Sequence, residues 1–102
     1  MMAEQKRAEI LDTAKRCVVG DRDSQYGSPK GSFEEIAFRW SHYLSRTSRH
    51  TILLDEHDVA IMMAEFKIAR IMTSHGKSED SYVDACGYLA IAGELSSEEN
   101  GE

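Results

Sequence analysis

Charged residues lie inside two apolar helical stretches of this sequence, and they are the first candidates for chemistry. They are Asp58, Glu65, Lys67 and Arg70 in residues 55–73, and Asp80 and Asp84 in residues 79–95. An unpaired charge is expensive to bury, so charges in such settings pair with one another, coordinate a metal or meet a ligand. The pattern therefore predicts a ligand site on these two stretches.

Four of these residues are carboxylates with the spacing of metal ligands. Asp80 and Asp84 are four residues apart and project from one face of a helix. Asp58 and Glu65 are seven residues apart and share a face of the preceding helix. Mg²⁺ takes oxygen ligands and keeps waters for a phosphate substrate, so the four are the predicted metal ligands and Mg²⁺ is the candidate cofactor.

The two basic residues, Lys67 and Arg70, are three apart and occupy a different side of their helix. In that position they could neutralise the charge of a phosphate. They could equally close interhelical salt bridges with Asp80 or Asp84, in which case the charges only set the register of the helices. The sequence leaves both open.

A loop-like segment, Gly20 to Gly31, directly precedes a predicted helix. Backbone amides at a helix N-terminus attract anions. Arg22 could clamp a phosphate there and Tyr26 could stack on a base, although the glycine spacing of a P-loop is absent. Arg22 and Tyr26 therefore join Lys67 and Arg70 as predicted ligand-binding residues.

Arginines and histidines also recur along residues 39–50. Such a stripe either receives phosphates or is a solvated helix face.

Four helices are expected to position these residues. Apolar periodicity predicts them over residues 3–19, about 33–44, 55–73 and 79–95. Ser32 and Glu35 have the spacing of a capping box, and Asp55 is placed to open the third helix. The expected fold class is all-α, a compact bundle of about four helices in one domain, residues 1–95. Residues 96–102 are expected to form a disordered acidic tail.

The third predicted helix is apolar on nearly every side, which is typical of a central helix or a subunit interface. One short four-helix subunit would leave part of this surface exposed to water. A homo-oligomer, most simply a dimer, is therefore expected to complete the bundle.

Composition limits the remaining classes of protein. The 102 residues are 41% hydrophobic and carry a net charge of −6, which argues against general nucleic-acid binding. No apolar run reaches the ~20 residues that span a bilayer, and the N-terminus lacks the apolar core of a signal peptide. Cys17 and Cys86 lack metal-ligand spacing and are expected to be free thiols. A cytoplasmic protein without membrane contact is expected.

Four ordered motifs carry a resemblance to a known family. They span Gly20–Pro29, Phe33–Leu44, Asp58–Arg70 and Asp80–Tyr88. Together they resemble a small all-helical domain of tailed phages and prophages, over about residues 9 to 95. More distantly, that domain is similar to phage nucleotide-modification-associated domains and to MazG-like nucleoside triphosphate pyrophosphohydrolases. The resemblance implies a protein in the cytoplasm of an infected bacterium.

MazG-like enzymes are oligomeric helical bundles that hold Mg²⁺ with a Glu-x-x-Glu pair on one helix and a Glu-x-x-Asp pair on the next. This chain departs from that pattern, because it offers Asp55-x-x-Asp58, a single Glu65 and Asp80-x-x-x-Asp84. The departure leaves catalysis open.

Three functions are consistent with these residues. The first is a phage-encoded nucleotide-handling enzyme that cleaves a nucleoside triphosphate between its α and β phosphates with Mg²⁺. The second is a non-catalytic nucleotide-binding protein that sequesters nucleotide signals of host defence. The third is a structural or partner-binding helical protein in which the charges serve only helix register.

Overall fold

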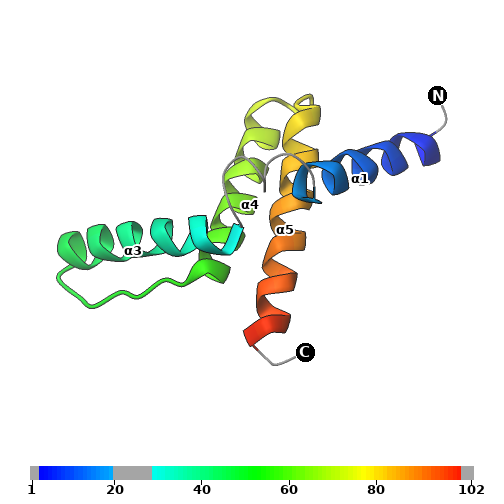
Figure 1. Cartoon of the computed structure of the whole chain (residues 1–102). Coiled ribbons are helices and arrows are strands. Elements are labelled where there is room, and N and C mark those ends of the chain that lie inside the picture. The colour runs from blue at the N-terminus through cyan, green and yellow to red at the C-terminus, as the bar shows by residue number, and fades with distance from the viewer. Residues whose placement is uncertain (1–2, 20–28, 100–102) are drawn as a thin grey trace.

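The computed structural model describes residues 3–19 and 29–99, and every regular element in these ranges is a helix (Figure 1). The helices are α1 (Ala3–Val19), α3 (Pro29–Ser48), α4 (Glu56–Thr73) and α5 (Glu79–Glu99). The predicted all-α bundle of four helices is confirmed for this part of the chain. None of these helices is long and apolar enough to cross a membrane.

The start of α3 differs from the prediction. The helix begins at Pro29 and not near Phe33, so Ser32 lies inside it, and the predicted capping box of Ser32 and Glu35 is wrong. Proline suits the first turn of a helix because its φ is already helical and its missing N–H would have no partner there. The only proline of the chain therefore belongs to the helix and not to the segment before it.

The end of α5 also differs. The helix continues to Glu99, so residues 96–99 of the predicted disordered tail are helical. The sequence has no helix-breaking residue between Leu95 and Asn100, which explains the extension. Residues 100–102 lie outside the described part of the chain.

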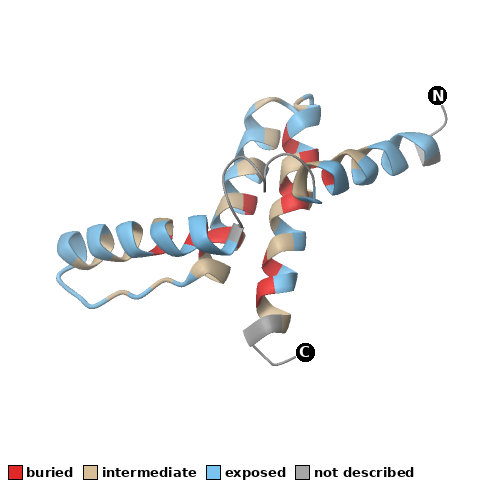
Figure 2. Ribbon diagram, viewed as in Figure 1, coloured by how far each residue is buried: buried red, intermediate tan, exposed pale blue. Residues whose placement is uncertain are grey.

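The core lies where α3, α4 and α5 meet, and it joins residues far apart in sequence. α4 and α5 form an antiparallel hairpin, and the first half of α3 crosses its open end (Figure 1). Buried residues line the sides of the helices that face one another (Figure 2). The core residues are Phe33, Ala37, Val59, Ala60, Ala92 and Leu95. Val59 and Ala60 are fully buried, which makes the first two turns of α4 the centre of this cluster.

A second contact holds α1 against α5. Gly87 of α5 is buried, and a Cβ atom added there would lie 3.2 Å from Cγ1 of Val18. Ala14 of α1 is also buried. The missing side chain of Gly87 thus lets α1 approach α5 closely.

The molecule is extended, because α1 and α3 leave the α4–α5 hairpin in opposite directions (Figure 1). Its radius of gyration is 15.4 Å and its extents are 52 × 33 × 26 Å. A compact domain of this length has a radius of gyration of about 13 Å. The outer side of α4 exposes Met62, Phe66, Ile68 and Met72. The expected homo-oligomer stays a prediction.

Replacing a glycine of α5 by leucine is expected to change the free energy of unfolding in opposite directions at two positions. We expect Gly87→Leu to lower the free energy of unfolding by about 1–3 kcal/mol, because the new side chain would overlap Val18. Gly93 has no atom within 4 Å of an added Cβ. We therefore expect Gly93→Leu to raise the free energy of unfolding by up to ~1 kcal/mol through helix propensity. Urea denaturation of dilute protein measures both, and equal effects would contradict this packing of α1.

Candidate functional site

An ion pair between α4 and α5 is the centre of the candidate site. Nζ of Lys67 lies 3.0 Å from Oδ2 of Asp84, and the two side chains are only 18% and 19% exposed. The pair is one of the interhelical salt bridges that the sequence allowed. Because each partner is largely removed from water, each needs the other to offset the cost of desolvation.

The turn between α4 and α5 sets the register that brings this pair together. His75 and Gly76 adopt positive φ angles of 57° and 80°, which reverse the chain within a few residues. Ser74 Oγ donates to the carbonyl of Ile71 at 3.0 Å and accepts from the backbone N–H of Ser78 at 3.2 Å. One serine hydroxyl thus connects the end of α4 to the segment that opens α5.

The first turn of α5 is fixed by further hydrogen bonds. The hydroxyls of Ser78 and Ser81 lie 2.7 Å apart, and Ser81 is buried. The Tyr82 hydroxyl donates to the carbonyl of Gly76 at 3.4 Å. These contacts hold the turn against α5, so that Asp84 projects toward α4 about one helical turn after Ser81.

An aromatic ring with two cations lies beside the ion pair. Nζ of Lys67 is 5.6 Å and Cζ of Arg70 is 5.9 Å from the centre of the Phe66 ring, within the range of cation–π attraction. Half of Phe66 is exposed, and Arg70 is exposed as well. We call Phe66, Lys67, Arg70 and Asp84 the α4–α5 charge cluster. Phe66 was missed from the sequence, although its position four residues before Arg70 is a signal that could have found it.

The other predicted pairing does not form. Asp80 and Arg70 are both exposed, and no ion pair joins them in the described structure. Asp80 lies in the first turn of α5, where a negative charge favours the helix dipole.

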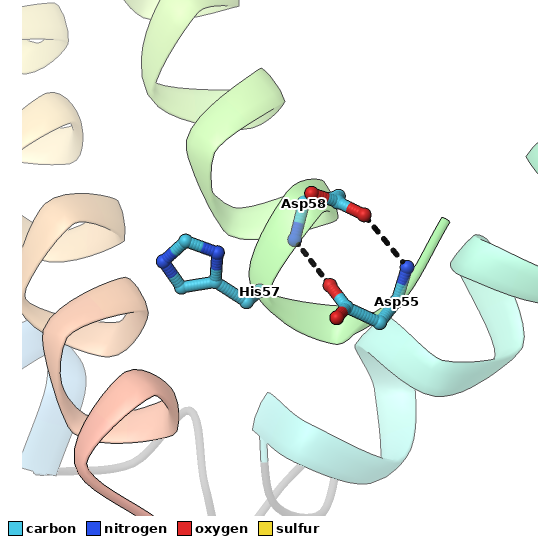
Figure 3. Close-up of side chains that lie close together, drawn as sticks. All are labelled: Asp55, His57 and Asp58. Carbon is cyan, nitrogen blue, oxygen red and sulfur yellow. Dashed lines mark hydrogen bonds between the residues drawn. The ribbon is translucent and has the colours of Figure 1, made fainter. Parts of the chain in front are cut away.

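Asp58 is used to begin α4. The Asp55 carboxylate accepts the backbone N–H of Asp58 at 2.8 Å, and the Asp58 carboxylate accepts the backbone N–H of Asp55 at 3.0 Å (Figure 3). This reciprocal capping box confirms that Asp55 opens the helix. The same side chain was predicted to bind a metal.

Within residues 3–19 and 29–99, one group of possible metal ligands comes together, and it is not the predicted one. It consists of Asp55, His57 and Asp58, each with a ligand atom within 4.8 Å of the others. Figure 3 shows the His57 ring leaving the turn on the side away from the two carboxylates' hydrogen bonds. His57 is half-buried. Because both carboxylates already accept backbone hydrogen bonds, the helix cap accounts for this group.

The four predicted metal ligands do not come together at one place in the described part of the chain. Asp58 is in the cap and Asp84 is paired with Lys67, whereas Glu65 and Asp80 are exposed. A Mg²⁺ site made of these residues stays a prediction. Arg22 and Tyr26 lie outside the described residues.

Comparison with known proteins gives a family and two curated relatives. Residues 9–96 match a family described as a domain of unknown function (DUF6378). The chain is 37% identical over 79 residues to the Gene 55 protein of Mycobacterium phage D29, covering 78% of this chain and 48% of the relative. It is 37% identical over 82 residues to the Gene 55 protein of Mycobacterium phage L5, covering 80% of this chain and 49% of the relative.

These matches agree with the resemblance to a phage domain over about residues 9 to 95. The chain spans about half the length of the curated relatives that it matches. No solved structure matches it. A link to MazG-like enzymes is not among these matches.

A double-mutant cycle measures the Lys67–Asp84 pair. We expect Lys67→Met and Asp84→Asn each to lower the free energy of unfolding by about 2 kcal/mol, because each leaves a largely buried charge without its partner. The double variant should lose less than the sum of the two, and urea denaturation gives all three values.

The exposed pair of Lys6 and Glu79 is the control for this cycle. Its hydrogen bond raises the pKa of Lys6, but its side chains are 46% and 58% exposed. Water and salt screen such a pair. We therefore expect the effects of Lys6→Met and Glu79→Gln on the free energy of unfolding to be additive. Additivity at Lys67 and Asp84 as well would contradict the ion pair described here.

Proposed function

The chain belongs to the DUF6378 family, and we propose that it binds a nucleotide or a similar phosphate-bearing small molecule at the α4–α5 charge cluster. The observation that carries this proposal is the Lys67–Asp84 pair, at 3.0 Å and less than one fifth exposed, beside the exposed side chain of Arg70. A lysine held by a carboxylate and an arginine one turn further along form a cationic edge with a fixed position.

The chemistry of this edge suits phosphate. A guanidinium presents several N–H donors in a plane and binds phosphate oxygens in a bidentate manner. Lys67 provides a point charge close by, and its ion pair with Asp84 fixes the position of its ammonium group. The half-exposed ring of Phe66 offers an aromatic face on which a base could stack. Phosphate and base would thus find partners within one helical turn.

The residues predicted in the loop complete this proposal. Arg22 would contact a second phosphate and Tyr26 would stack on the base, as the sequence suggested. Their inclusion would give the site three cationic groups and two aromatic rings.

Binding without turnover is favoured over hydrolysis by one observation. Two of the four predicted metal ligands already have other partners, since Asp58 caps α4 and Asp84 pairs with Lys67. In the binding reading, the protein sequesters a nucleotide signal of host defence, a role that agrees with the phage origin of its relatives.

MazG-like hydrolysis is the alternative. In that case Asp58, Glu65, Asp80 and Asp84 would hold Mg²⁺, which polarises a phosphoryl oxygen and activates water when bound. Lys67, Arg70 and Arg22 would neutralise the charge that develops on the triphosphate.

A purely structural role is the third reading, and the closed Lys67–Asp84 pair is the observation in its favour. A pair that only sets helix register predicts that no small molecule changes the stability of the protein.

Thermal unfolding with a panel of linear and cyclic nucleotides, in EDTA and in Mg²⁺, tests the proposal. A ligand at about 1,000 times its dissociation constant stabilises the folded state by ~4 kcal/mol, which is readily measured. We expect a shift in EDTA, with the nucleotide recovered intact by chromatography. Arg70→Gln should weaken binding by about tenfold to a hundredfold, because it removes charge-assisted hydrogen bonds.

Lys77→Gln is the matched control, since Lys77 is an exposed cation in the adjacent turn and lies outside the charge cluster. It should leave the shift unchanged. Release of pyrophosphate that requires Mg²⁺ and is lost in Asp84→Ala would favour the hydrolase instead. Absence of any shift or turnover with the whole panel would overturn both ligand readings and leave the structural one.

A further inference from the structure

Opposite charges are segregated between two parts of this chain. Residues 36–54 contain three arginines and no acidic residue. Residues 78–102 contain seven acidic residues and no lysine or arginine. The first segment is most of α3 with the extended chain that follows it, and the second begins just before α5 and includes all of it. One end of the molecule is therefore cationic, while α5 carries acidic residues toward both of its ends and no basic residue.

The cationic segment forms an arm that projects from the α4–α5 hairpin (Figure 1). The chain after α3 folds back along the helix and is held by two serines. Ser45 Oγ donates to the Ile52 carbonyl at 3.0 Å and accepts the Ile52 N–H at 2.8 Å. Ser41 Oγ makes the same two bonds with Leu54, at 3.5 and 2.8 Å. The arm thus has a defined shape of its own.

The arm exposes large side chains in a row. Phe38 is 67% exposed, and His42 and Arg46 follow at intervals of four residues, both exposed. Residues at this spacing lie on one face of a helix. We call Phe38, His42 and Arg46 the arm face. A phenylalanine exposed to this extent is a candidate contact for another molecule.

α5 carries a complementary row of small residues. Cys86, Ala90, Gly93 and Ser97 recur at spacings of four, three and four, and Ala90 and Gly93 are exposed. We call these four residues the small-residue face. An added Cβ at Gly93 would meet no atom within 4 Å, so nothing in the described chain requires a glycine there. Glycine inside a helix costs about 1 kcal/mol relative to alanine, which calls for a contact from outside.

We propose that the arm face of one copy packs against the small-residue face of α5 in a second copy. Large side chains on one helix fit the space that small ones leave on the other. The acid-free arm would lie on the helix without basic residues, so charge favours this pairing and disfavours arm on arm. A two-fold axis would create the contact twice, and α5 would receive the arm along its exposed side.

A second copy suits the arm better than a nucleic acid does. The net charge of the chain is −6, and one of the three arginines in the arm, Arg39, is already paired with Glu35 at 3.0 Å. Nucleic-acid binding requires a broader basic surface. The radius of gyration of 15.4 Å also exceeds that of a compact domain of this length. The arm therefore stands clear of the hairpin, where a second copy could pack against it.

Sedimentation velocity and light scattering over a range of concentrations test this contact. We expect the wild type to have twice the mass of the 11.5 kDa monomer. Gly93→Leu fills the small-residue face and Arg46→Glu reverses the charge of the arm face. Each should weaken the dimer by about tenfold or more while circular dichroism stays helical. Ala69→Leu, at an exposed position on α4 outside both faces, is the matched control and should leave the mass unchanged.

A mixing experiment separates this interface from other dimers. A heterodimer of the Gly93→Leu and Arg46→Glu chains retains one intact arm face and one intact small-residue face. The mixture should therefore assemble at concentrations at which neither variant does alone. The dissociation constant of the wild type should rise with salt, because screening weakens the attraction between arm and α5.

Three results would overturn the proposal. They are a monomeric wild type at high micromolar concentration, a dimer that Gly93→Leu does not weaken, and a mixture that assembles no better than its parts. If a single-stranded oligonucleotide co-sediments with a monomeric wild type but not with Arg46→Glu, the partner of the arm is a polyanion and not a second copy. Because none of these variants is in the α4–α5 charge cluster, failure here leaves the proposed ligand site intact.

Discussion

The close contact between α4 and α5 is the interaction on which the rest of this molecule depends. α1 packs against α5, and α3 packs against α4 and contributes to the core shared with α5, so both outer helices depend on the hairpin. The buried residues of α4 are Val59, Ala60 and Ala64, and those of α5 include Ala85 and Ala92. Small side chains bring two helix axes close together, but they bury little apolar surface. The hairpin is therefore well defined in geometry and modest in hydrophobic stabilisation.

Because the apolar core is modest, polar contacts have a large part in specifying how α4 and α5 align. Lys67 and Asp84 lie in the same helix–helix contact. A shift in the register of the two helices would leave one of these charges largely buried without its partner. The serines of the turn constrain that register from one end, and the Asp55–Asp58 capping box fixes where α4 starts at the other. The polar residues at both ends and in the middle thus specify one alignment of two helices whose apolar residues would tolerate several.

Sequence periodicity and capping chemistry predicted the helices well, because both are local. Asp55 was identified as the start of α4, and the end at Thr73 follows the apolar pattern. The start of α3 was misplaced, because a proline can end a loop or begin a helix and only the neighbouring packing decides. For the site, periodicity showed that Lys67 and Asp84 could meet, but not that they do. The crossing of two helices depends on alanines and on turn geometry, which spacing along one helix does not encode.

The serine hydrogen bonds along α3 also constrain how this arm could change in length. One helical turn, from Ser41 to Ser45, advances about 6 Å, and two extended residues, from Ile52 to Leu54, advance about 6.6 Å. The two lengths agree closely enough for each hydroxyl to bond one residue of the returning chain. An insertion in the helix alone would shift every hydroxyl out of phase with its partner. Viable length variation would therefore come in units of about six residues, four in the helix and two in the return, so that gaps between relatives in this region would occur in pairs of unequal size.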